Sequence, residues 1–517
     1  MARSRFQSPD SLPGATNFSR HDDLLGSENV VRMVKSNRPL WNQLARECDL
    51  TVNWGRGREP GNWELAALAF VASGHVDIQP WLSSTNASLW RLCGFAGKPP
   101  YKRVWRRLRE IESKHEAFQE AAGVLIRKAR EHDPRVGAHI HIDSTEDETH
   151  AALIHDCELG SCPRDSRPGV RPIREHTERA REERQTESTL PPEAVARVHG
   201  EIVFENGRTF KRFKLGECWF KSLDTEAGVR LYERSRGGRR FWSGYRSVKL
   251  VDHFTGGVIL AETHSASRQE NDIFEDSYDR LVEITEKIPE TVIGDKGFST
   301  SNVFEKCSTN GTAPIFPWRK SNFAMVRHDR ETHDRHGTPR CKHCGGPTDF
   351  KRFSPNDGRP RIWFDCMVGA SPECARTQSM SCAADWRLLV PLWRTDPLYH
   401  ELRQSHARFE GAHDYWRDRY KVGADTLANR PKMRGIGAHR LRSSVAMLIE
   451  WLRICTVEGW LGSERRNHRE PTRSFRESAL TATSNLLNMR ARVGLHAAYG
   501  PKAAQLGLGD ISPPSRR

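Results

Sequence analysis

Residues 240–267, RFWSGYRSVKLVDHFTGGVILAETHSAS, decide the fold class. Polar and apolar residues alternate on both sides of the Thr-Gly-Gly at 255–257, which is the pattern of two strands whose side chains point to opposite faces. A glycine-containing turn between two such runs predicts a β-hairpin. The segments that follow predict a helix at 277–288, a short strand within 290–299, a helix at 299–307 and a strand within 311–318. This order predicts an α/β fold with a mixed sheet and helices on its faces.

Composition limits the partners of the chain. The 517 residues carry a formal net charge of +15, so a polyanion is the expected partner, and nucleic acid is the first candidate. The sequence contains no apolar run of membrane-spanning length, and the first 20 residues lack the apolar segment of a signal peptide, so we expect a soluble, cytoplasmic protein without a membrane partner.

Two acids stand where apolar strands give way to polar residues. Asp143 lies in AHIHIDSTEDETH at 138–150, and Asp295 follows TVIG at 291–294. Ligands and catalytic groups gather at the carboxyl ends of parallel strands, so neighbouring strands would bring both carboxylates to one edge of the sheet. Each acid alone is also explained as a turn or helix cap. A third interpretation is a zinc site on the strand face that His139, His141 and Asp143 share, since imidazole suits Zn²⁺; in a Mg²⁺ site the two histidines would instead be packed strand residues.

The region before this sheet is predicted to be helical. Residues 83–100 offer a capping Ser/Thr/Asn run, a short helix and a Gly/Pro break, and 101–132 read as one long helix with a basic start. A short helix, a break and a basic helix suggest a helix-turn-helix that reads a DNA groove, whereas a helical bundle with a solvated basic face is the alternative. The expected phosphate contacts on this helix are Lys102, Arg103, Arg106 and Arg107.

Cysteines are concentrated in one short region. Of the 12 cysteines, five lie between Cys341 and Cys382, which indicates metal binding rather than a disulfide framework. Four thiolates hold Zn²⁺ tetrahedrally in structural ribbons and leave no open position for catalysis. The expected zinc ligands are Cys341, Cys344, Cys366 and Cys374, and Cys382 or His343 is an alternative for one of them.

Two quoted motifs carry a resemblance to a known family. Residues 244–272, GYRSVKLVDHFTGGVILAETHSASRQEND, followed by VIGDKGFS at 292–299, resemble the core of DDE transposases of bacterial insertion sequences, of the IS4/IS5/IS1182-like kind. In that family a Gly-Tyr-led hairpin precedes a helix, and a later strand ends in Gly-Asp-Lys/Arg-Gly-Tyr/Phe. The family's first acid stands in an Asp-Ser/Gly-Thr setting, which Asp143 and the two residues after it match.

The resemblance implies an RNase H-like core and a metal-dependent active site. Asp143 would bridge two Mg²⁺ (or Mn²⁺) ions, and Asp295 and a glutamate on a later helix would complete one ion each. Glu410 is preferred as that glutamate because a basic helix continues from it, and Glu401 is the alternative. Its spacing departs from the family's tyrosine–arginine–glutamate–lysine pattern, since the expected Tyr, Arg and Lys positions hold Arg403, His406 and Arg417. Further DNA contacts are expected at Lys296, Arg417 and Lys421.

Together, pattern and resemblance predict an α/β protein with an RNase H-like mixed five-stranded sheet and flanking helices, an all-α N-terminal domain and a small zinc-ribbon insertion. The expected divisions are 1–25 disordered, 26–134 helical and DNA-binding, 135–320 the first catalytic part with a charged insert at 155–200, 321–385 the zinc ribbon, 386–462 the second catalytic part, and 463–517 a basic tail.

The expected function is transposition. The chain would cut double-stranded DNA at terminal inverted repeats and transfer the strands into target DNA, as a homodimer on DNA in the bacterial nucleoid. The alternative is a zinc-containing DNA-binding protein that descends from a transposase and no longer catalyses. The sequence leaves open the repeat and target sequences, the use of a hairpin intermediate, and the activity of this copy.

Overall fold

The computed structural model describes most of the chain between residues 26 and 461. The described residues are 26–50, 62–149, 151, 154–156, 200–215, 218–233, 239–317, 333–334, 337–354, 361–375, 377–381, 387, 393–394, 397–423 and 430–461. The expected disordered start, the basic tail and most of the charged insert lie outside them. None of the described helices is both long and apolar enough to cross a membrane.

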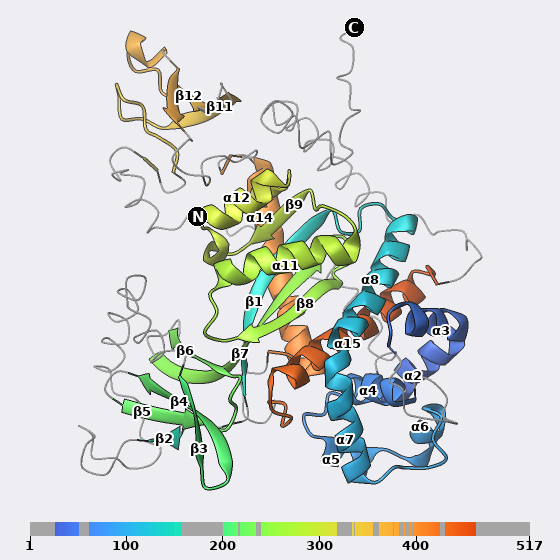
Figure 1. Cartoon of the computed structure of the whole chain (residues 1–517). Helices are drawn as coiled ribbons and strands as arrows, with labels where there is room; N and C mark the ends of the chain where they lie inside the picture. Colours follow the sequence, from blue (N-terminus) through green and yellow to red (C-terminus); the bar gives the residue numbers. More distant parts are fainter. Residues whose placement is uncertain are drawn as a thin grey trace, which may run out of the picture.

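A mixed sheet forms the centre of the molecule (Figure 1). Its strands are β1 (His139–Glu148), β6 (Gly228–Glu233), β7 (Arg239–Asp252), β8 (Val258–Ser265), β9 (Thr291–Gly294) and β10 (Ala313–Ile315). The order is β10-β9-β1-β7-β6, and β8 also pairs with β7. β7 is antiparallel to β1, β6 and β8, whereas β9 is parallel to β1 and β10.

The expected hairpin at 240–267 is confirmed as β7 and β8, but the sheet has six strands rather than five. The additional strand exists because β7 is 14 residues long. Residues 239–244 of β7 pair with β6, and residues 245–251 pair with β8. The sheet is otherwise the mixed α/β arrangement that was predicted, and it is consistent with an RNase H-like core.

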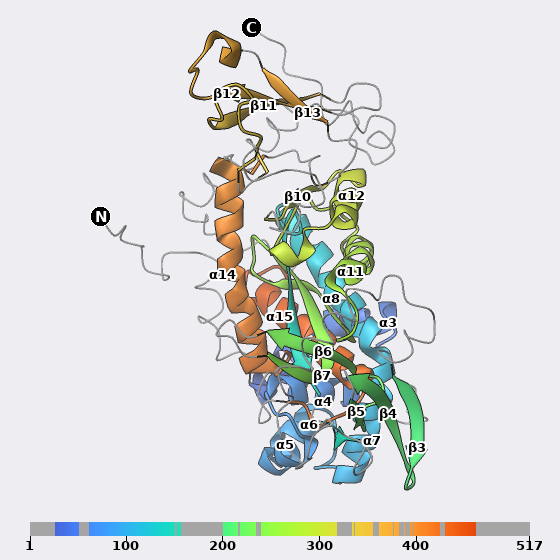
Figure 2. The ribbon, with the colours of Figure 1, turned by 90° about the vertical axis from the view of Figure 1, so that its left-hand side faces the viewer.

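Helices cover both faces of the sheet. The bounds of these helices are α11 (Glu270–Thr285), α12 (Ser301–Thr309), α14 (Pro397–Tyr420) and α15 (Ile436–Val457). Figures 1 and 2 show α11 and α12 on one face and α14 on the other. α15 packs against β8 and α14, and nearly all of its side chains are buried, as its apolar sequence predicts.

The described residues before β1 form helices only. These are α2 (Ser27–Ser36), α3 (Arg38–Glu47), α4 (Asn62–Ala72), α5 (Ile78–Ser84), α6 (Ala87–Leu92), α7 (Tyr101–Ile111) and α8 (His115–His132). The Asn86 side chain caps α6, as expected. The single long helix expected at 101–132 is wrong, because a 3₁₀ turn at Glu112–Lys114 separates α7 from α8. The turn packs against α15.

Two small sheets extend from the central sheet. One contains β2 (Ile154–His155), β3 (Glu201–Glu205), β4 (Arg208–Leu215) and β5 (Cys218–Ser222), and it lies in the connection between β1 and β6. The other contains β11 (Thr348–Ser354), β12 (Arg361–Cys366) and β13 (Gln378–Ser381), and it lies between β10 and α14. The second occupies the segment where the cysteine-rich insertion was expected.

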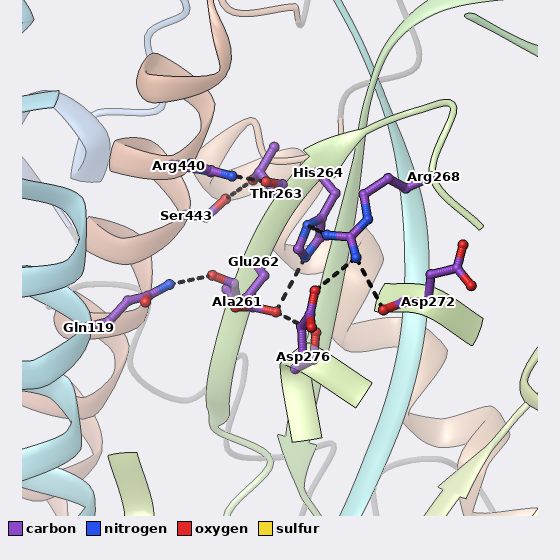
Figure 3. A network of polar contacts seen from close by, with 11 residues as sticks. Gln119, Ala261, Glu262, Thr263, His264, Arg268, Asp272, Asp276, Arg440 and Ser443 are labelled. Carbon is purple, nitrogen blue, oxygen red and sulfur yellow. Dashed lines mark hydrogen bonds and ion pairs between the residues drawn. The ribbon is translucent and has the colours of Figure 1, made fainter. Parts of the chain in front are cut away.

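Polar contacts anchor the edge strand β8 to three helices (Figure 3). Gln119 of α8 donates to the Ala261 carbonyl at 2.8 Å, and Arg440 of α15 donates to the Thr263 carbonyl at 3.1 Å. On the α11 side, Ser277 donates a hydrogen bond to the carboxylate of Glu262. These contacts fix β8 and therefore the β7 residues that pair with it.

Candidate active site

The parallel pairing of β1 with β9 places two of the predicted acids on adjacent strands. Ile142 pairs with Gly294, so Asp143 and Asp295 each follow the last paired residue of their strand. The negative charge of Asp295 acts on the ionisation of Asp143. The expectation that Asp143 ends its strand is wrong, because the antiparallel pairing with β7 carries β1 on to Glu148. Only the parallel pairing of β1 with β9 ends here, at Ile142, immediately before Asp143.

Two glycines of GDKG at 294–297 leave room for the groups that surround Asp295. A Cβ on Gly294 would lie 2.8 Å from a ring carbon of Phe316 and 2.9 Å from a side-chain carbon of Ile142, so a side chain there would push β9 away from β1. A Cβ on Gly297 would lie 2.3 Å from a carboxylate oxygen of Glu270 and 2.6 Å from one of Asp295. The Gly297 amide donates to the Asp295 carboxylate and fixes the turn after β9.

Glu270, at the start of α11, is a further acid at this position. Its carboxylate accepts a hydrogen bond from the Ser144 hydroxyl at 2.7 Å and pairs with Arg246 at 3.1 Å. Arg246 is nearly buried. Three carboxylates, those of Asp143, Asp295 and Glu270, therefore lie around the point where β1 and β9 separate.

Burial and negative neighbours raise the pKa of Asp143 to about 7. Desolvation is the largest cause, and the charges of Asp295 and Glu270 act in the same direction, whereas the Ser144 amide and the Lys249 ammonium oppose it. The Ser144 amide donates to Oδ1 of Asp143 at 2.7 Å. A carboxylate in this setting gains from a divalent cation, and Mg²⁺ prefers oxygen ligands of this kind.

A buried histidine and a buried lysine stand on the α14 side of Asp143. Nε2 of His413 lies 3.6 Å from Oδ2 of Asp143. Nδ1 of His413 lies 2.6 Å from the Thr145 hydroxyl and 3.4 Å from Nζ of Lys249. Lys249 is fully buried and is the cross-strand partner of Asp143 in the β1–β7 register. Burial lowers the pKa of Lys249 to about 8.

Helix α14 carries both candidates for the third acid. Glu401 is exposed, next to the buried Leu402. Glu410 occupies the helix position four residues after His406 and three before His413, which are both buried against β1. Residues three and four apart share a helix face, so position 410 belongs to the β1-facing part of α14. The Glu410 side chain is outside the described atoms, and the described acids do not bring three ligand atoms within 4.8 Å of one another.

The histidines of β1 have partners other than a metal. His139 lies 3.0 Å from the Thr291 hydroxyl, and His141 is fully buried between His253 at 2.9 Å and His406 at 3.3 Å. Within the described side chains, no third ligand atom joins His139, His141 or Asp143 within metal-binding distance. The zinc-face interpretation therefore has no support from this geometry.

Comparison with known families assigns the region that contains this site. Residues 224–427 match the family model of the transposase DDE domain. This region is therefore similar to a transposase DDE domain. The match includes Asp295 and position 410, but it covers less than half of the chain and begins after Asp143. No curated protein matches the chain significantly.

The matched region contains the four predicted zinc ligands within its β11–β13 insertion. Cys341, Cys344, Cys366 and Cys374 bring their four sulfur atoms within 4.8 Å of one another. The Sγ atoms of Cys341 and Cys374 are 3.8 Å apart, and those of Cys344 and Cys366 are 3.6 Å apart. The cluster could bind a metal ion through four thiolates. The alternative ligand Cys382 lies outside the described residues, and His343 does not join the cluster.

The predicted DNA-contacting residues lie on three elements. On α7, the side chains of Lys102, Arg103 and Arg106 are exposed, whereas Arg107 is half-buried and pairs with Glu110 at 2.5 Å. Lys296 is exposed on the turn after β9, next to Asp295. Near the end of α14, Arg417 pairs with Asp414, and Lys421 follows the helix in a left-handed conformation. These positions remain predicted DNA contacts.

Sequence reasoning missed Glu270, Arg246, Lys249 and His413. Lys249 gave the clearest signal, since a lysine between apolar residues of a predicted inner strand needs a partner when buried. Glu270 had the ordinary explanation of an acid in the first turn of a helix. His413 gave no local signal, because its importance comes from the packing of α14 on β1.

Proposed function

We propose that this protein is a transposase that cuts DNA at the ends of a mobile element and joins those ends to target DNA, with divalent metal ions held by Asp143, Asp295 and Glu410. The observation that carries the proposal is the pairing of Ile142 with Gly294, which sets Asp143 beside Asp295. The presence of a transposase DDE domain supports the same chemistry.

The donor set suits Mg²⁺ or Mn²⁺. When bound, two such ions activate the attacking water or 3′-hydroxyl and stabilise the leaving oxygen. Asp143 has Asp295 after the adjacent strand and His413 of α14 at 3.6 Å, which supports the proposal that Asp143 would be the carboxylate shared by both ions. Arg246 neutralises Glu270, so Glu270 is a supporting residue rather than a ligand in this proposal.

The experiment is metal-dependent nicking of a DNA fragment that carries the element's own ends. Wild-type protein should nick with Mg²⁺ or Mn²⁺, and Asp143→Ala should bind the fragment but not nick it. If wild type binds and nicks no better than Asp143→Ala, the alternative of a non-catalytic DNA-binding protein holds.

Two conservative variants identify the third acid. Glu410→Gln should abolish nicking, because position 410 faces β1, whereas Glu401→Gln should nick like wild type because Glu401 is exposed. The opposite result would transfer the role to Glu401. Both variants change a carboxylate on the same helix, so they serve as matched controls.

The second proposal is a structural zinc ion held by Cys341, Cys344, Cys366 and Cys374. A tetrahedral ion with Zn–S bonds of about 2.3 Å separates its sulfurs by about 3.8 Å, close to the observed 3.8 and 3.6 Å. The purified protein should contain one zinc per chain by elemental analysis. Cys344→Ser should lower that content, and Cys48→Ser, outside the cluster, should not.

DNA binding should depend steeply on salt, because Lys102, Arg103, Arg106 and Lys296 present exposed cations to phosphates. We expect a homodimer on DNA, since transposition joins two ends. Light scattering of the complex with the end fragment would test this, and a monomer would contradict it.

A further inference from the structure

A buried imidazole connects the proposed metal-binding Asp143 to a buried lysine. The His413 side chain is 7% exposed, and Lys249 is fully buried. The two ring nitrogens have different polar neighbours, since Nε2 lies 3.6 Å from Oδ2 of Asp143, whereas Nδ1 contacts Thr145 and Lys249. β1, β7 and α14 each contribute to this arrangement.

The surroundings of Nδ1 set the tautomer of His413. A lysine ammonium has three donors and no acceptor, so at 3.4 Å it requires an acceptor at Nδ1. The Thr145 hydroxyl, 2.6 Å away, can donate to the same lone pair. A neutral imidazole that accepts at Nδ1 carries its proton on Nε2, which is the nitrogen that faces Asp143.

We propose that His413 is a positioning residue that directs an Nε2–H at Oδ2 of Asp143, with its tautomer set by Lys249 and Thr145. The Ser144 amide holds Oδ1 of the same carboxylate at 2.7 Å. The Ser144 hydrogen bond and the polar contact with His413 at 3.6 Å then restrain the two oxygens of Asp143 from opposite partners. The metal part of this inference rests on the proposed function, whereas the tautomer part does not.

Lys249 is itself held in place from α14 and α15. Its ammonium lies 5.6 Å from the centre of the Trp416 ring, and the Trp416 indole donates to Glu450 at 2.6 Å. Trp416 and Glu450 are fully buried. The two helices that cover this face of the sheet therefore fix the cation that selects the tautomer, and a change in their packing reaches Asp143 through His413.

The first test measures the tautomer directly, without activity or metal. In long-range ¹⁵N–¹H NMR spectra of ¹⁵N-histidine-labelled full-length protein, the His413 signal, assigned by its loss in His413→Gln, should show a proton on Nε2. Lys249→Met, which keeps the volume but removes the donor, should increase the Nδ1–H form. A wild-type signal from the Nδ1–H tautomer would overturn the proposal.

The second test measures metal affinity with Mn²⁺ alone, by electron paramagnetic resonance. Loss of a residue that orients a metal ligand costs about 10-fold or more in metal affinity. His413→Leu should therefore bind Mn²⁺ about 10-fold more weakly, whereas His413→Gln, which keeps an N–H donor, should stay near wild type. His406→Leu removes another buried imidazole of α14 that contacts His141 rather than Asp143, and it should also stay near wild type.

Each outcome decides one of the two proposals. Equal Mn²⁺ affinity of His413→Leu and wild type, or equal loss in His406→Leu, would overturn the positioning role. If wild type binds Mn²⁺ no better than Asp143→Asn, the metal site proposed for the transposase fails, and the tautomer measurement still tests His413. Unfolding curves of His413→Gln and Lys249→Met show whether each variant is folded.

Discussion

Asp143 and Glu262 are both acids of the central sheet, but their surroundings shift the pKa of the carboxyl group in opposite directions. Side-chain exposure is 29% for Asp143 and 18% for Glu262. Burial raises the pKa of both carboxyl groups, but at Glu262 the hydrogen bonds from His264 and Ser277 outweigh burial, and its pKa is lowered. At Asp143 the neighbouring acids add to burial, and the pKa rises to about 7.

The comparison separates an acidic cluster held by hydrogen bonds from one in which neighbouring acids raise the pKa of a carboxyl group. In the Glu262 cluster, His264 contacts Glu262 at 3.3 Å and Arg268 contacts His264 at 3.2 Å and Asp276 at 2.8 Å, so both acids have hydrogen-bond donors (Figure 3). Around Asp143, the nearby cation Lys249 is separated from it by His413. A carboxyl group whose pKa is raised by burial and by neighbouring acids is a property of candidate functional sites.

The largest expected difference between substitutions of Asp143 and Glu262 is in the rate of catalysis. Asp143→Ala should lower the nicking rate by about 10³-fold or more, because metal ions supply several kcal/mol of transition-state stabilisation. Glu262→Gln should retain a rate within about threefold of wild type, because Glu262 takes no part in the proposed metal site. Single-turnover nicking of the end fragment measures both. A large loss in Glu262→Gln would remove the distinction between the two clusters.

The next expected difference is measured without metal: the stability of Asp143 and Glu262 variants relative to wild type should depend on pH in opposite ways. The folded pKa of Asp143, about 7, is above the ordinary value of an aspartate, so its contribution is most favourable below about pH 4 and is lost as pH rises towards 7. Asp143→Asn should therefore be more stable than wild type by about 1–4 kcal/mol at pH 7.5, and the difference should shrink at pH 5. Urea unfolding in EDTA measures this difference.

Glu262 should behave in the reverse way. Its pKa is lowered in the fold, so its stabilising contribution is present at neutral pH and lost as pH falls through the folded pKa. Glu262→Gln should be less stable than wild type at pH 7 by about 1 kcal/mol, and the deficit should shrink at lower pH. The same sign of pH dependence in the two variants would contradict the comparison.

A further effect on stability is expected from metal binding. At 10 mM, Mg²⁺ should raise the free energy of unfolding of wild type and of Glu262→Gln by about 1–3 kcal/mol if the concentration is 10 to 100 times Kd. Their unfolding temperatures should rise accordingly. Asp143→Asn should show little of this protection. Thermal unfolding with Mg²⁺ and with EDTA provides the measurement. Equal protection of all three proteins would place the binding elsewhere.

The sequence by itself determined the features that depend on local pattern. Alternation on both sides of 255–257 predicts the β7–β8 hairpin, since side chains of a strand alternate between faces. The apolar run before Asp295 predicts β9 and places that acid at its end. The cluster of Cys341, Cys344, Cys366 and Cys374 followed from spacing within one short segment.

Only the tertiary structure decided which groups surround these acids. The parallel register of Ile142 with Gly294, the continuation of β1 past Asp143, and the break between α7 and α8 come from pairing and packing between distant segments. His413 lies 268 residues from Thr145 and yet contacts it. Burial and electrostatic coupling depend on distances in space, so the sequence placed the two aspartates at the site, and the fold supplied the histidine and the lysine beside them.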